Sequence, residues 1–161
     1  MSRSVVEFRV RGEPVPEPRP RARVVHTRGG RAIASIYVPA TSAAWKRAVA
    51  AHASLGMSGR DPETGPVEVA LEFWMPRTKP QLRDTAPSGP IPAPERGLGD
   101  ADNLAKGVLD AMEGVVFVND SQVVVMKVVK ARAPHGQVAG VIVGVYALSP
   151  AAPALFEDAA R

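Results

Sequence analysis

Residues 100–124, "DADNLAKGVLDAMEGVVFVNDSQVV", combine a helical pattern with strand-forming runs. The first half repeats apolar side chains at the spacing of one helix face: Leu104, Val108, Ala111 and Met112. The second half is rich in β-branched residues, in "VVFV" (115–118) and in the following run "QVVVMKVVKA" (122–131). The first run predicts a strand, and the second predicts a central strand buried on both faces. A helix followed closely by strands indicates a fold that mixes both kinds of element.

Hydrophobic patterns elsewhere in the chain predict the other elements. Apolar and polar residues alternate along two segments, as in half-buried strands: 5–12 and 67–74. A hairpin is expected from segments 22–26 and 31–39, with its turn at Gly29 and Gly30. A second helix is expected from an N-cap at Thr41 to Leu55, closed by Gly56, and a last strand at 137–148. The prediction is an α+β fold with a small mixed β-sheet and two main helices packed on it.

The length of 161 residues corresponds to about one domain. We expect residues 1–148 to form a single domain and residues 149–161 to form a loosely ordered C-terminal tail. Residues 75–99 contain six prolines and show no periodicity, which predicts a long loop inside the domain.

The composition excludes several classes of protein. The chain has no cysteine, which rules out a disulfide framework, a thiolate nucleophile and a cysteine-based zinc site. The longest weakly polar run, 138–148, is much shorter than the ~20 residues of a membrane span. The N-terminus "MSRSVVEFRV" carries charges where a secretory segment is apolar. We therefore expect a cytoplasmic protein with no membrane partner.

Charge is distributed unevenly along the chain. Residues 1–50 contain ten Lys or Arg and three acidic residues, whereas residues 51–161 contain ten basic and thirteen acidic residues. A basic first third favours a polyanionic partner, although a solvated basic surface gives the same pattern. The candidates for contacts with backbone phosphates are Arg19, Arg21, Arg23 and Lys46.

Three aspartates and a lysine carry the candidate chemistry. Asp100 suits a helix N-cap and Asp102 suits the first turn, so both have a purely structural interpretation. Two carboxylates at this spacing also suit a hard cation such as Mg²⁺, and Asp120 precedes a strand that can bring a third carboxylate to them. Lys106 lies four residues after Asp102, where it can form an ion pair or meet the negative charge of a phosphate.

Residues 100–124 resemble the signature of the RusA-type Holliday junction resolvases, which runs Asp-x-Asp-Asn-Leu-x-Lys, then Leu-Asp-Ala, then Asp-x-Gln-Val. The segments "GEPVPEPRPRAR" (12–23) and "YVPATSAAWK" (37–46) resemble the opening region of the same family. This chain has Asn119 and Asp120 where the family usually has two aspartates, and Glu17 and Pro18 in place of the family's usual lysine.

The resemblance implies a homodimer that binds four-way DNA junctions and nicks two symmetric strands with Mg²⁺, for which Mn²⁺ is a possible substitute. By motif, the metal ligands are Asp100, Asp102 and Asp120, and the essential lysine is Lys106. No nucleotide cofactor is expected, since the chain has no P-loop. Two alternatives remain open: a module that binds branched DNA without cutting it, and a Mg²⁺-dependent phosphohydrolase acting on nucleotides.

Overall fold

The computed structural model describes residues 2–37, 39–95 and 97–149. Its body is a five-stranded mixed sheet in the order β1-β7-β4-β6-β5. The strands of this sheet are β1 (Arg3–Arg11), β4 (Val67–Met75), β5 (Ile91–Pro92), β6 (Val123–Arg132) and β7 (Gly140–Ala147). Strands β4 and β6 run parallel, and the pairs β1–β7, β4–β7 and β5–β6 run antiparallel.

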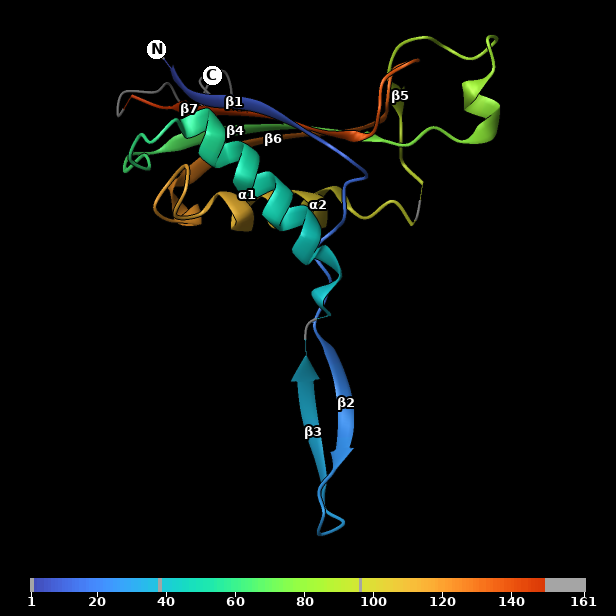
Figure 1. Cartoon of the computed structure of the whole chain (residues 1–161), viewed down its shortest axis with the longest axis vertical. Coiled ribbons are helices and arrows are strands. Elements are labelled where there is room, and N and C mark those ends of the chain that lie inside the picture. The colour runs from blue at the N-terminus through green and yellow to red at the C-terminus, as the bar shows by residue number, and fades with distance from the viewer. Residues whose placement is uncertain (1, 38, 96, 150–161) are drawn as a thin grey trace, which may run out of the picture.

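Two α-helices, α1 (Ala43–Met57) and α2 (Ala101–Met112), cover one face of this sheet (Figure 1). Their apolar residues and the inward side chains of β1, β4 and β7 form one buried core. The predicted stripe on α2 is buried at Leu104, Val108, Ala111 and Met112. The predicted α+β fold is therefore confirmed. Three short 3₁₀ helices complete the described elements: η1 (Ala40–Ser42), η2 (Lys79–Leu82) and η3 (Asp120–Gln122).

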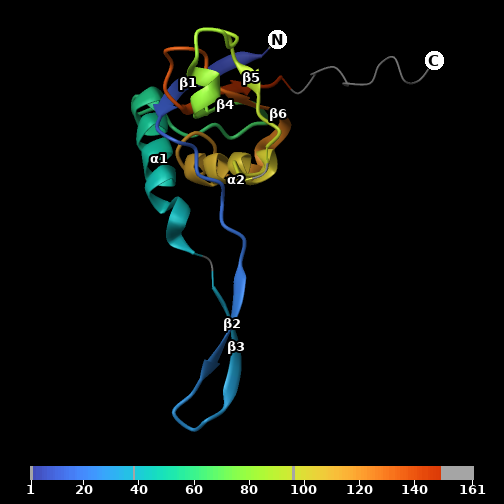
Figure 2. The same cartoon turned by 90° about the vertical axis from the view of Figure 1, so that its right-hand side faces the viewer.

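Strands β2 (Arg21–His26) and β3 (Ala32–Tyr37) form a separate two-stranded sheet. This hairpin, which we call the arm, projects far from the body on the side of the sheet that carries the helices (Figures 1 and 2). The hairpin expected around Gly29 and Gly30 is confirmed. Paired residues of an antiparallel hairpin share a face, so one face of the arm carries Arg21, Arg23, Ser35 and Tyr37, and the other carries Ala22, Val24, Ala34 and Ile36.

Two strand predictions were wrong. Residues 115–118 do not form a strand, because they make a tight turn with single bridges from Phe117 to Glu63 and Glu113, although Val116 and Phe117 are buried. Strand β6 is not central. Its second neighbour, β5, pairs only with Ala131 and Arg132, so most of β6 is a free edge of the sheet, with Val124 60% exposed.

The end of α1 also differs from the prediction. Gly56 lies inside the helix, which continues to Met57 and is closed by Ser58 in the left-handed conformation. The N-cap is Ser42 rather than Thr41, since a 3₁₀ turn precedes the helix. A Cβ atom on Gly56 would lie 2.6 Å from the Val6 side chain, so glycine permits α1 to approach β1 closely.

We expect Gly56→Val to lower the free energy of unfolding by about 1–3 kcal/mol, the usual cost of overpacking a well-filled core. Denaturant unfolding of the purified protein measures this change. Leu55→Val is the matched control, because Leu55 is 76% exposed on the same helix. Equal stability of the two variants would show that α1 does not pack on β1 as described.

In the described residues of the long loop predicted at 75–99, the regular elements after the end of β4 are η2 and the two-residue strand β5. The guanidinium of Arg77 fastens it by donating hydrogen bonds to the carbonyls of Gln81, Gly89 and Ala133, at 2.6–2.8 Å. The expected C-terminal tail lies outside the described residues from 150 onward. No helix in the described part of the chain is long and apolar enough to cross a membrane.

Candidate functional site

Asp102, Lys106 and Asp120 line one open hollow of about 250 Å³ beside α2. Asp102 and Lys106 come from successive turns of the helix, Asp120 comes from η3, and Met126 of β6 also contributes to the lining. All three charged side chains are exposed. Within residues 2–37, 39–95 and 97–149, the carboxylates of Asp102 and Asp120 have no hydrogen bond or ion pair. Both are therefore available to a ligand.

The turn around Asp120 leaves its carboxylate free because its neighbours make the local hydrogen bonds. The Asn119 side chain accepts a hydrogen bond from the Ser121 amide at 2.9 Å, and Gln122 accepts one from the Asn119 amide at 2.8 Å. Gln122 also donates to the carbonyls of Glu63 and Gly65. Asn119 and Gln122 thus hold the turn in place. This division of roles supports the choice of Asp120, rather than position 119, as the functional acid.

Asp100 occupies the N-cap position of α2 with extended backbone angles, but its side chain makes no capping hydrogen bond. Instead, Asp100 Oδ2 accepts a hydrogen bond from Arg19 Nη2 at 3.5 Å. Both side chains are more than 70% exposed, so this ion pair contributes little to stability. Asp100 precedes the first turn of α2 and is not among the residues that line the hollow.

The donors at the hollow suit a hard divalent cation. Mg²⁺ prefers carboxylate oxygens, keeps several waters and is commonly held by one or two carboxylates together with substrate phosphates. Asp102 and Asp120 supply such a pair, and Asp100 lies two residues before Asp102. In the described part of the chain no three acidic or histidine side chains are already gathered around one point. The structure thus brings together Asp102, Asp120 and Lys106, and leaves Asp100 with Arg19.

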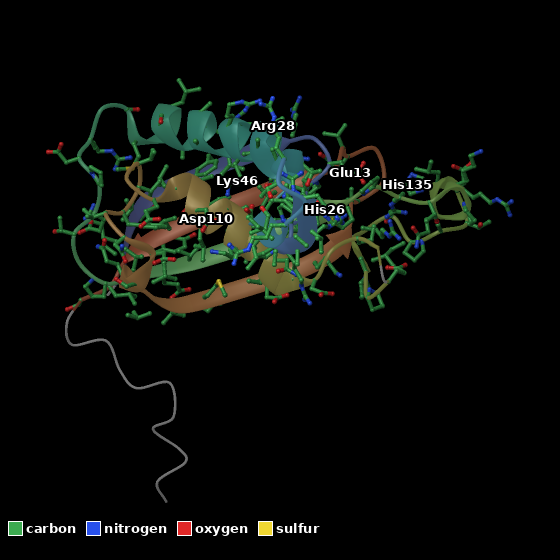
Figure 3. All side chains as sticks on the ribbon, turned by 90° about the horizontal axis from the view of Figure 1, so that it is seen from below. Glu13, His26, Arg28, Lys46, Asp110 and His135 are labelled. Carbon is green, nitrogen blue, oxygen red and sulfur yellow. The ribbon has the colours of Figure 1, made fainter. Side chains whose placement is uncertain are left out.

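Lys106 does not pair with Asp102. Its ammonium donates to Asp110 Oδ1 at 3.1 Å, one turn further along α2. The other oxygen of Asp110 accepts from Lys46 Nζ at 3.3 Å, and Lys46 Nζ also donates to Glu17 Oε2 at 3.1 Å. Figure 3, which looks at the helix side of the sheet, shows Lys46 and Asp110 close together in front of the strands. Reasoning from the sequence did not connect Asp110 with Lys46 and Glu17, because these contacts join segments far apart in the chain.

Lys46 is therefore placed between two carboxylates, and its side chain is only 29% exposed. Burial of the ammonium acts to lower the pKa of Lys46. The hydrogen bonds with Glu17 and Asp110, together with the negative charges of both groups, outweigh this effect and raise the pKa above its ordinary value. Lys46 thus remains charged at neutral pH.

The arm presents the other predicted basic residues to solvent. Arg21 and Arg23 share the face that carries Tyr37, and the Arg23 guanidinium stacks over the Tyr37 ring at 5.2 Å from its centroid. Arg28 and Arg31 lie at the exposed tip, where the sequence had not singled them out. All residues of β2 and all but Ser35 of β3 are exposed, so these cations can meet a polyanion.

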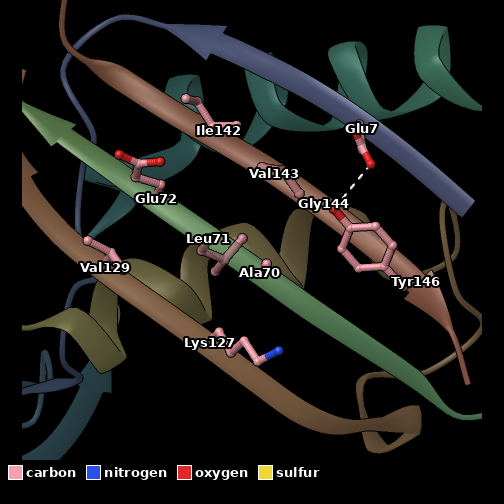
Figure 4. Close-up of a pocket in the computed structure, with 10 residues that line it drawn as sticks. All are labelled: Glu7, Ala70, Leu71, Glu72, Lys127, Val129, Ile142, Val143, Gly144 and Tyr146. Atoms are coloured by element: carbon pink, nitrogen blue, oxygen red, sulfur yellow. Dashed lines mark hydrogen bonds between the residues drawn. The ribbon is translucent and has the colours of Figure 1, made fainter. Parts of the chain in front are cut away.

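A second hollow lies on the open face of the sheet, with the helices behind the strands (Figure 4). Its polar residues already have partners: Tyr146 donates to Glu7 at 3.1 Å, and Glu72 accepts from Trp74 at 2.7 Å. Burial, followed by the hydrogen bond with Glu7, raises the pKa of Tyr146 above its ordinary value. This hollow is on the opposite face of the sheet from α2 and offers no carboxylate pair comparable to Asp102 and Asp120.

Comparison with known proteins gives two findings. Residues 11–146 match the family described as Endodeoxyribonuclease RusA, which covers most of the chain. The chain is also similar to "Uncharacterized protein YqaN" of Bacillus subtilis (strain 168), with 34% identity over 137 residues. That alignment covers 78% of this chain and 86% of the Bacillus protein.

Proposed function

This chain belongs to the RusA endodeoxyribonuclease family, a family of nucleases that act on DNA. We propose that it resolves four-way DNA junctions by paired symmetric nicks that require a divalent metal. The observation that carries the proposal is the pair of free carboxylates, Asp102 and Asp120, in one hollow with Lys106. The match over residues 11–146 also supports a single nuclease domain within residues 1–148.

Asp102 and Asp120 would hold a Mg²⁺ ion, or Mn²⁺ in its place, with Asp100 as the third ligand after it leaves Arg19. Such an ion supplies charge stabilisation for phosphodiester hydrolysis and lowers the pKa of bound water. The ammonium of Lys106, an exposed residue of the same hollow, would bind a non-bridging oxygen of the scissile phosphate. The open hollow allows a DNA backbone to reach these groups without a change in the fold.

The arm would supply most of the affinity for DNA. The face of the arm that includes Tyr37 carries Arg21 and Arg23, and Arg19 lies at the root of the arm, where it pairs with Asp100. Contacts with phosphates fix position without reading sequence, which suits recognition of junction shape. Lys46 was expected to join these contacts, but its bonds with Glu17 and Asp110 favour a role inside the protein.

The free edge of β6 supports assembly as a homodimer. An unpaired strand edge tends to pair with another chain unless charges or bulges protect it. Val124, Met126 and Val129 are each about half exposed or more along this edge. Two copies joined there by a twofold axis would extend the sheet and place two hollows, each lined by Met126, near the dimer axis. Paired sites are what symmetric nicking requires.

We expect Val124→Lys to weaken the dimer by at least ~10-fold, because lysine on a strand edge opposes pairing. Sedimentation at micromolar concentration measures the shift from dimer to monomer. Val138→Lys is the matched control, since Val138 is 53% exposed in the turn before β7. A native protein that sediments as a monomer, or a Val124→Lys variant that stays dimeric, would contradict this interface.

Mapping the nicks tests the proposed function. We expect end-labelled strands of a synthetic four-way junction to be cut at symmetric positions on two opposing strands, with a matched linear duplex left intact. Equal cutting of junction and duplex would show that the protein is a nuclease without selectivity for junctions.

A further inference from the structure

The root of the arm, residues 15–19, crosses directly over α2. The Glu17 amide donates to the Asn103 carbonyl at 3.0 Å. Gly99 has a φ of 80°, and a Cβ atom there would lie 2.8 Å from Pro16. Arg19 reaches Asp100, the N-cap of the helix. The arm root is thus packed against the turn and helix that carry the candidate site.

A chain of ion pairs connects this root to Lys106. Glu17 Oε2 accepts from Ser42 Oγ at 2.9 Å and from Lys46 Nζ at 3.1 Å. Lys46 Nζ also donates a hydrogen bond to Asp110 Oδ2, and Asp110 Oδ1 accepts one from Lys106 Nζ. The exposed fractions of the first three side chains are 15% for Glu17, 29% for Lys46 and 25% for Asp110. Lys106, at 60%, is the exposed end of the chain.

Because Glu17, Lys46 and Asp110 are largely buried, they restrict the position of the exposed Lys106. An isolated Lys–Asp pair on a helix surface leaves both side chains mobile and contributes only a few tenths of a kcal/mol. Here Lys46 holds one oxygen of Asp110 in place, so the second oxygen is presented to Lys106 in a fixed position. A group whose partner is fixed in this way needs little rearrangement to act.

We propose that Asp110 is a positioning residue that, held by Lys46 and Glu17, fixes the ammonium of Lys106 at the mouth of the hollow. The inference rests on the proposed nuclease function, in which Lys106 binds the scissile phosphate. The same chain connects the root of the DNA-binding arm to the site. Asp110 itself touches no substrate in this account.

The test measures single-turnover cleavage of a four-way junction at saturating enzyme, together with junction affinity. We expect Asp110→Asn and Lys46→Met to lower the cleavage rate by ~10–100-fold, the same scale as the loss of a partner that orients a metal ligand. The dissociation constant should change by less than ~3-fold. Asp110→Glu and Lys46→Arg keep the charges and should recover most of the rate. Cleavage at the native rate in both neutral variants would overturn the proposal.

Tyr146→Phe is the control, because it removes a side-chain hydrogen bond with Glu7 on the open face of the sheet, opposite α2. A loss of rate in Tyr146→Phe equal to that in Asp110→Asn would also overturn the proposal, since general destabilisation would then account for both. Lysine acetylation read by mass spectrometry separates this inference from the nuclease function. If the native chain does not cut, the nuclease function fails, and faster acetylation of Lys106 in Asp110→Asn than in the native chain still supports positioning. Unchanged acetylation would refute it.

Discussion

Replacing Asp120 by Asn is expected to lower the rate of junction cleavage by more than ~100-fold. Loss of a partner that only orients a metal ligand costs 10–100-fold, and Asp120 is proposed as a ligand itself. The substitution removes a negative charge from an exposed side chain without hydrogen bonds among the described residues, so folding should be unaffected. Single-turnover cleavage with Mg²⁺, beside thermal unfolding of both proteins, measures these two effects.

Asp61→Asn is the control for this experiment, because it makes the same chemical change at an exposed position in the turn after α1. Junction affinity measured without metal should be equal or slightly higher in Asp120→Asn, since a carboxylate near a phosphate backbone is repelled. Full activity of Asp120→Asn would remove η3 from the site and leave Asp102 as the only carboxylate of the proposed pair.

The double substitution Arg21→Gln with Arg23→Gln is expected to weaken junction binding by about 10–100-fold and to make it less sensitive to salt. Each phosphate contact contributes about 0.9 to the slope of log affinity against log salt concentration. The slope should therefore fall by about 2 when two contacts are removed. Binding titrations at several salt concentrations give both the dissociation constant and the slope.

The matched control removes the same charge from the body of the protein by replacing Arg3 and Arg60 with Gln. This variant should keep both the affinity and the salt slope of the native protein. If the two double variants lose the same affinity, net charge alone attracts the DNA, and the arm has no special part in binding.

Periodicity predicted the elements whose patterns are local. The α2 stripe from Leu104 to Met112 and the hairpin around Gly29 and Gly30 both follow from spacing and turn chemistry. Periodicity did not predict the place of β6 in the sheet, because a β-branched run suits a central strand and an edge strand alike. β6 is mostly an edge strand because its neighbour β5 is only two residues long. Periodicity also failed at residues 115–118, where buried apolar residues serve a turn instead of a strand.

The structure brings together three of the four predicted site residues and leaves out Asp100, and the connections between them were not predictable. Asp102, Lys106 and Asp120 belong to a motif that is contiguous in sequence, and the structure places them around one hollow. The partner of Lys106 was not predictable, since an i,i+4 pair is equally possible with Asp102 or Asp110. The choice of Asp110 depends on Lys46 and Glu17, which lie 64 and 93 residues away from it in sequence.

Junction resolution is tested by cleavage of a four-way junction, beside a linear duplex of the same sequence, by the native protein and by Asp102→Asn. We predict paired nicks in the junction alone, which require Mg²⁺, disappear with EDTA and are absent in the variant. Tight junction binding by the native protein without cutting in any divalent ion would contradict this account and leave a module that binds branched DNA.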